Sequence, residues 1–259
     1  MQVVGGVGIG GDVFVGGNMT VTGTINATIN GSVTSLSGGS VNATTGAFSG
    51  AVIITDSTQA TSTITGALQV VGGTGIGGNL YVGGHIVGGV NNAAGGNYSA
   101  VLGGKGATTR GITGANAWGY NFTTQGDAQQ VNYLLSVATT TASPAVLTSD
   151  QGAAGATNQI IMPNNSAYGF KGMITARDIA NGWVAVWEIR GGIRRVANAA
   201  STTIVGTPVV DRIAYDTAAS TWGIAVVADT TNGGIQFQVT GAAGTNIHWV
   251  TNMTTIEVA

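Results

Sequence analysis

The chain has 259 residues, of which 7% are charged and 43% are apolar, and its formal net charge is −2. So few charges would leave a lone globule poorly solvated, so we expect part of the uncharged surface to be buried against another molecule, first of all against copies of the same chain. The Lys and Arg excess typical of proteins that bind nucleic acids or anionic membranes is missing, so neither partner is expected.

The absence of cysteine excludes disulfides, cysteine-based zinc sites and thiol nucleophiles. The sequence has no basic and apolar leader at its start and no run of about 18 apolar residues, so neither signal-directed export nor membrane insertion is expected. No cofactor or metal motif such as H-E-x-x-H occurs. Whatever holds this fold together is therefore noncovalent.

The first predicted element, residues 1–90, is a glycine-rich repetitive β shaft. Apolar and polar side chains alternate from Asn18 to Val33, and the many β-branched residues favour extended backbone. Because a thin ribbon cannot bury its own apolar face, we expect three copies to intertwine as a homotrimeric shaft of the triple β-helix or β-roll kind. The expected trimer core comprises Val21, Ile25, Ile29, Val33, Leu68, Val70 and Val82.

Two glycine-rich copies lie within this shaft: eleven of fifteen positions are identical between Val3–Gly17 and Val70–Gly84. Each copy contains G-x-G-x-x-G, the pattern of a dinucleotide-binding turn. A phosphate site needs a helix to begin there and an acid about twenty residues later, and the sequence offers neither. The glycines are therefore interpreted as positions where backbones approach closely or adopt positive φ.

The second predicted element, residues 91–126, carries S-x-V-x-G at Ser99 to Gly103 and A-x-A-x-G at Ala115 to Gly119, sixteen residues later. This pair of motifs resembles the head repeats of trimeric autotransporter adhesins, which implies a β-roll of stacked coils in a three-chain assembly. Small residues at that spacing allow coils to stack tightly. An ordinary glycine-rich loop is the alternative.

Taken with the GIGGNLYVGG repeat and the segment from Thr141 to Asp178, the whole chain resembles bacteriophage tail fibre proteins. The resemblance implies a virion protein, made in the host cytoplasm, whose partners are two sister copies, other phage tail or virion proteins and a host cell-surface glycan or protein. The chain departs from autotransporters in lacking a signal peptide, a coiled-coil stalk and a membrane anchor.

The third predicted element, residues 127–259, is a C-terminal antiparallel β-sandwich of the jelly-roll kind, forming a distal tip. Alternation places Tyr168, Phe170, Ile174 and Ala176 on one face, with Lys171 and Arg177 on the other. The clearest hairpin runs from Trp222 to Val239 with its turn at Asn232 to Gly234. The fold class predicted for the whole chain is all-β.

Two groups of residues are candidate receptor contacts. Trp183, Trp187 and Trp222 fall at inward positions and are expected in the core, whereas aromatic rings beside amides or a histidine suit carbohydrate. A cluster of guanidinium groups suits acidic sugars or phosphates, although a solvated hairpin end or ion pairs between subunits would use the same residues. The candidates are Trp249, His248, Trp118, Arg190, Arg194 and Arg195.

We expect no enzymatic activity. Glycan-degrading tailspikes use carboxylate pairs, and the only spacing here that suggests a pair is Asp211 with Asp216. His85 lies in a shaft repeat, where a structural role is favoured. The sequence therefore predicts a noncatalytic trimeric fibre that binds a receptor by multivalency. The alternatives are a virion decoration that binds no receptor and a glycan-degrading tailspike.

Overall fold

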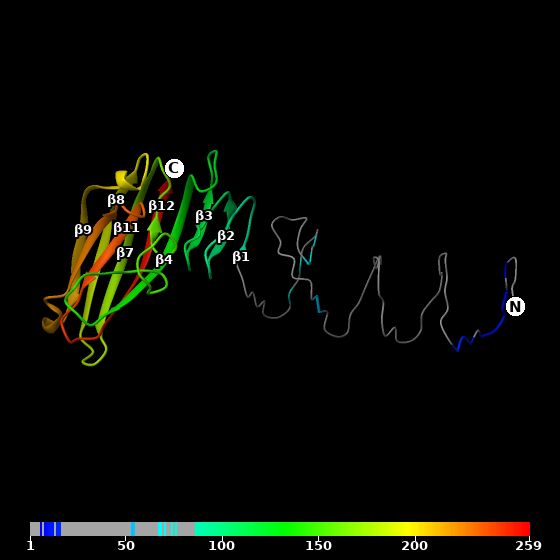
Figure 1. Ribbon diagram of the computed structural model, residues 1–259, viewed down its shortest axis with the longest axis horizontal. Helices are drawn as coiled ribbons and strands as arrows, with labels where there is room; N and C mark the ends of the chain where they lie inside the picture. The colour runs from blue at the N-terminus through cyan, green and yellow to red at the C-terminus, as the bar shows by residue number, and fades with distance from the viewer. Residues whose placement is uncertain are drawn as a thin grey trace. The chain divides into compact units, whose positions relative to one another are not determined.

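The computed structural model describes residues 86–259 continuously and, before them, residues 6, 8–12, 14–16, 53–54, 67–68, 70, 74 and 76. The chain divides into two compact units, Met1–Gly75 and Ile76–Ala259. The second unit contains all the secondary structure described below (Figure 1). Five of the expected trimer-core residues lie outside the described residues, namely Val21, Ile25, Ile29, Val33 and Val82.

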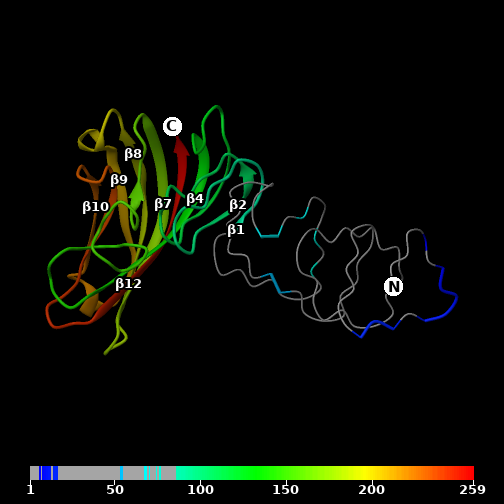
Figure 2. The ribbon, with the colours of Figure 1, turned by 45° about the vertical axis from the view of Figure 1, so that its right-hand side comes forward.

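The described part of the chain is all-β, as predicted, with two short 3-10 helices, η1 and η2, and no α-helix. Eight strands form one mixed sheet in the order β1-β2-β3-β4-β12-β7-β8-β9, and four form a smaller sheet in which β10, β5 and β6 all pair with β11 (Figure 2). The elements are β1 (Ile86–Val87), β2 (Ala100–Lys105), β3 (Asn116–Tyr120), β4 (Ala128–Thr139), β5 (Ala145–Val146), β6 (Ile160–Ile161), β7 (Ser166–Asp178), β8 (Val184–Arg195), η1 (Ala199–Ser201), β9 (Thr203–Tyr215), η2 (Thr217–Ala219), β10 (Gly223–Asp229), β11 (Gly234–Thr240) and β12 (Ile247–Val258).

Strands β1, β2 and β3 are parallel and come from successive coils of the chain. Ala100 pairs with Ile86 on one side and with Asn116 on the other, so each coil takes 14 to 16 residues. Val101 lies opposite Ala117, the 16-residue spacing that the two sequence motifs carry. A bulge at Leu102 then shifts the register, so that Gly103 faces Trp118 rather than Gly119.

Glycine is required where these coils stack most closely. A Cβ on Gly104, whose φ is +101°, would lie 1.9 Å from the carbonyl oxygen of Gly119. A Cβ on Gly119 would in turn lie 2.5 Å from the carbonyl oxygen of Ala128 on β4. The close approach therefore continues from the coils into the first antiparallel strand, since β3 pairs directly with β4. The predicted second and third domains share one sheet.

The antiparallel part of the large sheet buries one face. Side chains alternate between buried and exposed along β7 and β12, as the period of two in the sequence predicts. The smaller sheet contacts the buried face: the rings of Phe170 on β7 and Phe237 on β11 meet edge to face with centroids 5.7 Å apart. The predicted hairpin is confirmed, because Gly223 to Asp229 pair with Gly234 to Thr240.

Three tryptophans form the centre of this core. Trp249 on β12 stacks on Trp187 at 5.6 Å and lies 5.9 Å from Trp222, and all three are at most 2% exposed. Trp187 and Trp222 are therefore in the core, as predicted. Trp183 is not: it is 39% exposed, because it lies in the turn before β8, where the alternation of a strand has not yet begun.

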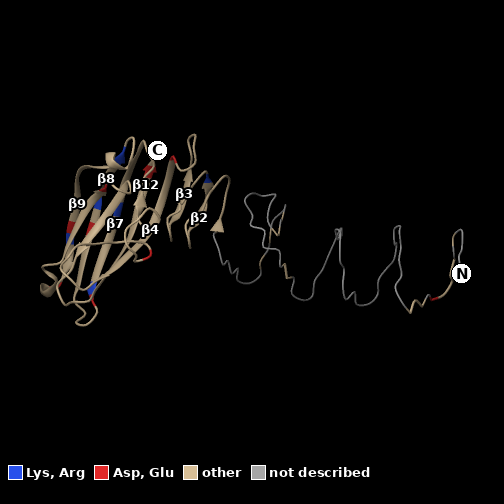
Figure 3. Ribbon diagram, viewed as in Figure 1, with Lys and Arg blue, Asp and Glu red and all other residues tan. Residues whose placement is uncertain are grey.

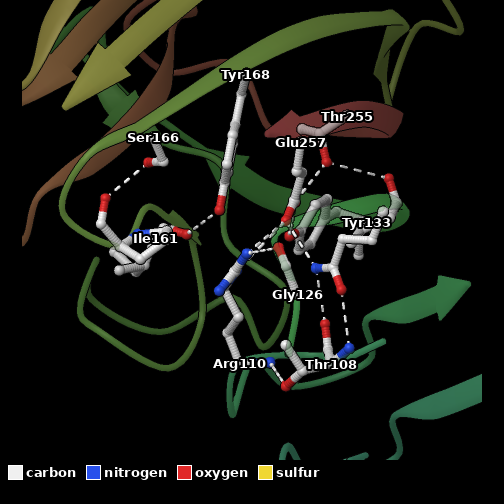
Figure 4. A network of polar contacts seen from close by, with 12 residues as sticks. Thr108, Arg110, Gly126, Tyr133, Ile161, Ser166, Tyr168, Thr255 and Glu257 are labelled. Carbon is white, nitrogen blue, oxygen red and sulfur yellow. Dashed lines mark hydrogen bonds and ion pairs between the residues drawn. The ribbon is translucent and has the colours of Figure 1, made fainter. Parts of the chain in front are cut away.

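A buried polar network joins the parallel coils to the antiparallel strands (Figure 4). At its centre is the carboxylate of Glu257 on β12, whose side chain is fully buried. Its Oε2 accepts hydrogen bonds from Gln129 at 2.7 Å and from Arg110 at 3.3 Å. Its Oε1 accepts from Thr255 at 2.7 Å and from Tyr133 at 3.1 Å.

Two of these partners, Arg110 and Gln129, connect Glu257 to the backbone of the coils. Arg110, in the connection between β2 and β3, donates to the carbonyl oxygen of Gly126 at 2.6 Å. Gln129 on β4 both donates to and accepts from the backbone of Thr108, at 2.9 and 2.8 Å. Burial lowers the pKa of Arg110, but Tyr168 and Glu257 raise it, and the net value lies above the ordinary one. The guanidinium therefore stays charged beside the carboxylate.

Two further carboxylates close turns. Burial raises the pKa of Asp127, but backbone N–H groups of residues 122–124 donate to its carboxylate and lower the pKa to about 2. Burial likewise raises the pKa of Asp229, and the side-chain and backbone N–H groups of Asn232 are the largest opposing causes, which lower it to about 2. Both groups are charged in the folded protein at neutral pH.

The trimer core, the shaft, the domain limits and the closed sandwich predicted from the sequence are not tested by the described residues of the single chain. Leu68 and Val70 of the expected trimer core are 67% and 50% exposed in the single chain. The intertwined shaft, the domain limits at residues 90 and 126 and a closed jelly-roll-like sandwich remain predictions. Residues of both sheets contribute to one buried core, and the strand order of neither sheet closes on itself.

We expect Glu257→Ala to lower the free energy of unfolding by about 3–5 kcal/mol, because it leaves the largely buried guanidinium of Arg110 without its carboxylate. Glu188→Ala is the matched control, since its ion pair with Arg190 is about half exposed and contributes about 1 kcal/mol or less. Chemical denaturation of both variants measures the difference, and equal losses would contradict the role given to Glu257.

Stability is expected to fall as the pH drops from about 4 to about 2. A carboxyl whose pKa is lower in the folded than in the unfolded chain stabilises the fold above its ordinary pKa near 4, and that stability is lost as pH falls through the folded value. Asp127 and Asp229 both satisfy this condition. Melting temperatures over this range should fall more steeply in the parent than in the D127N/D229N double variant; parallel curves would refute the assignment.

Candidate functional site

The face of the large sheet opposite the smaller sheet, called the outer face below, is open in the single chain. It carries large apolar side chains that a sheet normally covers. Those that are 45% or more exposed include Ile86, Leu102, Tyr120, Leu134, Met173, Val205, Val250, Ile256 and Val258.

One hollow on the outer face lies between β2 and β3. It is lined by Leu102, Gly103, Gly104, Trp118 and Gly119 and has a volume of about 460 Å³. The bulge turns Leu102 outward, where it is 64% exposed. The hollow thus offers an indole side chain beside bare glycine backbone.

A second hollow lies over β7, β8, β9 and β12 and has a volume of about 540 Å³. Gly169 lies in its floor, and a Cβ there would meet nothing within 4 Å. Lys171, Arg190 and Thr254 line one side of it. Both hollows fall within the usual size range of small-molecule sites, with apolar walls and a few polar groups.

The two hollows are joined by one line of residues that crosses the strands. Strand register pairs each member with the next across β2, β3, β4, β12, β7 and β8. We call this line the transverse row; it consists of Gly103, Trp118, Gln130, Ile256, Gly169 and Gly192.

Cations lie on both sides of the transverse row. On one side, the next cross-strand line contains Lys171 on β7 paired with Arg190 on β8. On the other side, Arg194 on β8 pairs with Ala167. Figure 3 marks the basic positions on β7 and β8 in blue. Arg190 also binds Glu188 Oε1 at 2.6 Å, so part of its charge is balanced within the protein.

The candidate receptor contacts predicted from sequence do not form one cluster. Trp118, Arg190 and Arg194 lie in or beside the transverse row. His248 is exposed but pairs with Arg177 near the far end of β7. Trp249 is fully buried and donates from Nε1 to Thr139 at 2.9 Å, so as an exposed contact its assignment was wrong.

Arg195 has a structural role. Its Nη1 donates to the carbonyl oxygens of Met162 and Gly233 and so holds the loops that flank β6 and precede β11. Lys171 and Ile256 were missed as site residues. Alternation predicted that Lys171 points outward. The position of Lys171 beside the transverse row, however, depends on pairing between segments far apart in the chain.

The suggested carboxylate pair of Asp211 and Asp216 is not formed by the strand register. Asp216 follows β9 and accepts a hydrogen bond from the backbone of Val184 at 2.7 Å. Asp211 instead lies directly opposite Glu188 on β8. Cross-strand neighbours have Cβ atoms about 4.5–5.5 Å apart, so Glu188 and Asp211 place two carboxylates side by side on the outer face.

Within residues 86–259 and the shorter described stretches, no three His, Asp or Glu side chains gather as a metal site would require. None of the helices described has the length and hydropathy needed to cross a membrane.

No protein-family model matches the chain, and no curated protein matches it in sequence. Among solved structures, it is similar to the tailspike protein gp49 of Acinetobacter baumannii bacteriophage Fri1, with 9% identity and a TM-score of 0.30. It is also similar to the tailspike protein of Acinetobacter baumannii phage AM24, with 10% identity and a TM-score of 0.24.

These matches cover 50% and 61% of this chain, but only 18% and 33% of the two tailspikes. The Fri1 protein is described as a capsular polysaccharide depolymerase. This finding contradicts the prediction that the chain is not an enzyme, and that prediction is withdrawn. The TM-scores are too low to assign either the fold or the activity of those proteins to this chain.

Proposed function

We propose that the chain is a homotrimeric bacteriophage tail protein, part of the virion, that attaches the particle to a glycan on the host cell surface. Its remaining partners would be other tail proteins. A purely structural decoration of the virion is the alternative, and it leaves the open hollows of the outer face without a role.

The observation that carries the proposal is the exposure of the repeat segment. Every large apolar residue described before residue 77 is exposed in the single chain; these are Ile9, Phe14, Val15, Ile53, Ile54, Leu68, Val70 and Ile76.

A chain with 7% charged residues cannot leave so much apolar surface in water. Sister copies would cover it, as the shaft predicted from the alternating sequence requires. The resemblance of the repeats to phage fibres supports the same assembly. In a trimer, three copies of the outer-face site would bind by multivalency, so weak single sites suffice.

A second candidate function, glycan cleavage by the same protein, is favoured by the pairing of Glu188 with Asp211. Retaining glycosidases hold two carboxyl groups about 5–5.5 Å apart, and side chains that lie directly opposite each other on paired strands can bring two carboxyl groups to such a distance. The pair lies one line of residues beyond Lys171 and Arg190, and Glu188 lines a further hollow that shares Lys171 and Thr254 with the second one.

The full chain is expected to sediment as a trimer, label host bacteria and compete with phage adsorption. Val70→Asp should yield monomers, because three carboxylates would meet near the axis at several kcal/mol each, whereas Val70→Thr, of similar shape, should still assemble. A folded monomer of the parent chain, or heat-resistant trimers of Val70→Asp, would refute the assembly.

Cleavage predicts new reducing ends when the full chain is incubated with host surface polysaccharide. E188Q and D211N should each abolish their release, while D216N, whose residue is bonded to the Val184 backbone, should keep it. If the parent releases none, or if E188Q and D211N stay active, this second candidate is rejected and attachment alone remains.

A further inference from the structure

We propose that the transverse row binds a linear polysaccharide that carries carboxylate groups and lies across the strands of the outer face. The inference rests on the proposed attachment function and names its ligand class and binding path. Trp118 would be the apolar platform at one end, with Lys171 and Arg194 the cations near the other.

The path follows from the shape of the row. Three of its six members are glycines, at 103, 169 and 192, so the row is low at its two ends. Hollows occupy both ends. From Trp118 on β3 to β8 there are four steps between strands, about 19 Å at the usual strand spacing. Such a length suits an extended chain rather than a single sugar.

The chemistry at the Trp118 end suits a sugar ring. The half-buried indole of Trp118 offers apolar area together with a polar handle, and the exposed Leu102 adds a second apolar wall. Gln130, which pairs with Trp118, carries an amide that both donates and accepts hydrogen bonds. Ring faces and hydroxyl groups of a sugar would thus both find partners.

The charges select an acidic ligand. The ten outer-face positions that flank the row on β4, β12, β7, β8 and β9 include Lys171, Arg190 and Arg194 but no Asp or Glu. The nearest acids, Glu188 and Asp211, lie one line further away. The row is therefore locally positive in a chain of net charge −2, and the field favours an anion over another copy of this chain.

Carboxylate is the anion to which we commit. Arg190 already holds one carboxylate, that of Glu188, at 2.6 Å, and a guanidinium has further N–H donors in the same plane. Lys171 lies directly opposite on β7 and adds a compact charge. Uronic acids along a polysaccharide would present such groups at regular intervals.

The test is titration calorimetry of the full chain with polygalacturonate, alginate and hyaluronate, and with neutral dextran. At least one acidic polymer should bind, more weakly as salt rises, and dextran should not. W118A and K171Q should each weaken binding by about fivefold to tenfold. R177Q removes one cation from the same face of β7, about 20 Å from Lys171, and should leave affinity within about twofold.

Binding to none of the acidic polymers, equal binding of dextran, or full affinity in both W118A and K171Q would overturn the proposal. If iodide does not quench the fluorescence of Trp118 in the assembled chain, Trp118 is buried between copies. The outer face would then be assigned to assembly instead. If the site fails while the chain still competes with phage adsorption, the proposed function stands; if competition fails too, both fall.

Discussion

The buried carboxylate of Glu257 is the constraint on which the rest of the described structure depends. It binds Arg110 from the coils and Gln129 from β4, and register places Tyr168 on its other side. On the inner face, Gly119, Gln129, Glu257 and Tyr168 pair with one another in that order. Their sequence neighbours Trp118, Gln130, Ile256 and Gly169 are members of the transverse row. Because neighbours along a strand point to opposite faces, the network on the inside fixes the strands whose other side forms the proposed site. A parallel coil and an antiparallel sheet thus present one continuous surface.

Local chemistry explains why part of this structure is predictable from sequence. The alternation around Tyr168 and the hairpin that ends at Val239 involve residues close in the chain. Their period of two can be recognised directly from the order of apolar and polar residues. Trp183 shows the limit, since the pattern does not say where a strand begins. The 16-residue motif spacing also predicts the pairing of Val101 with Ala117, up to the bulge that follows.

The site itself required information that no local pattern carries. Arg110 and Glu257 are 147 residues apart, and Trp118 shares a row with Gly169 only through two intervening strands. An isolated Lys or Gly gives no sign of such a partner. Charged residues that lie near each other in sequence were equally misleading, because Arg194 faces outward beside the row whereas Arg195 holds two loops through backbone carbonyls.

The central claim is that one ligand chain contacts Trp118 and Lys171 at the same time, and the dependence of affinity on ligand length tests it most directly. Oligogalacturonates of increasing length would be titrated into the parent chain and into W118A. The account predicts equal affinities for short oligomers, which bind at the cations alone, and a loss in W118A that appears only when the oligomer can span the three strand steps from Trp118 to Lys171, about 14 Å. A loss that is the same at every length, or absent at all lengths, would contradict it.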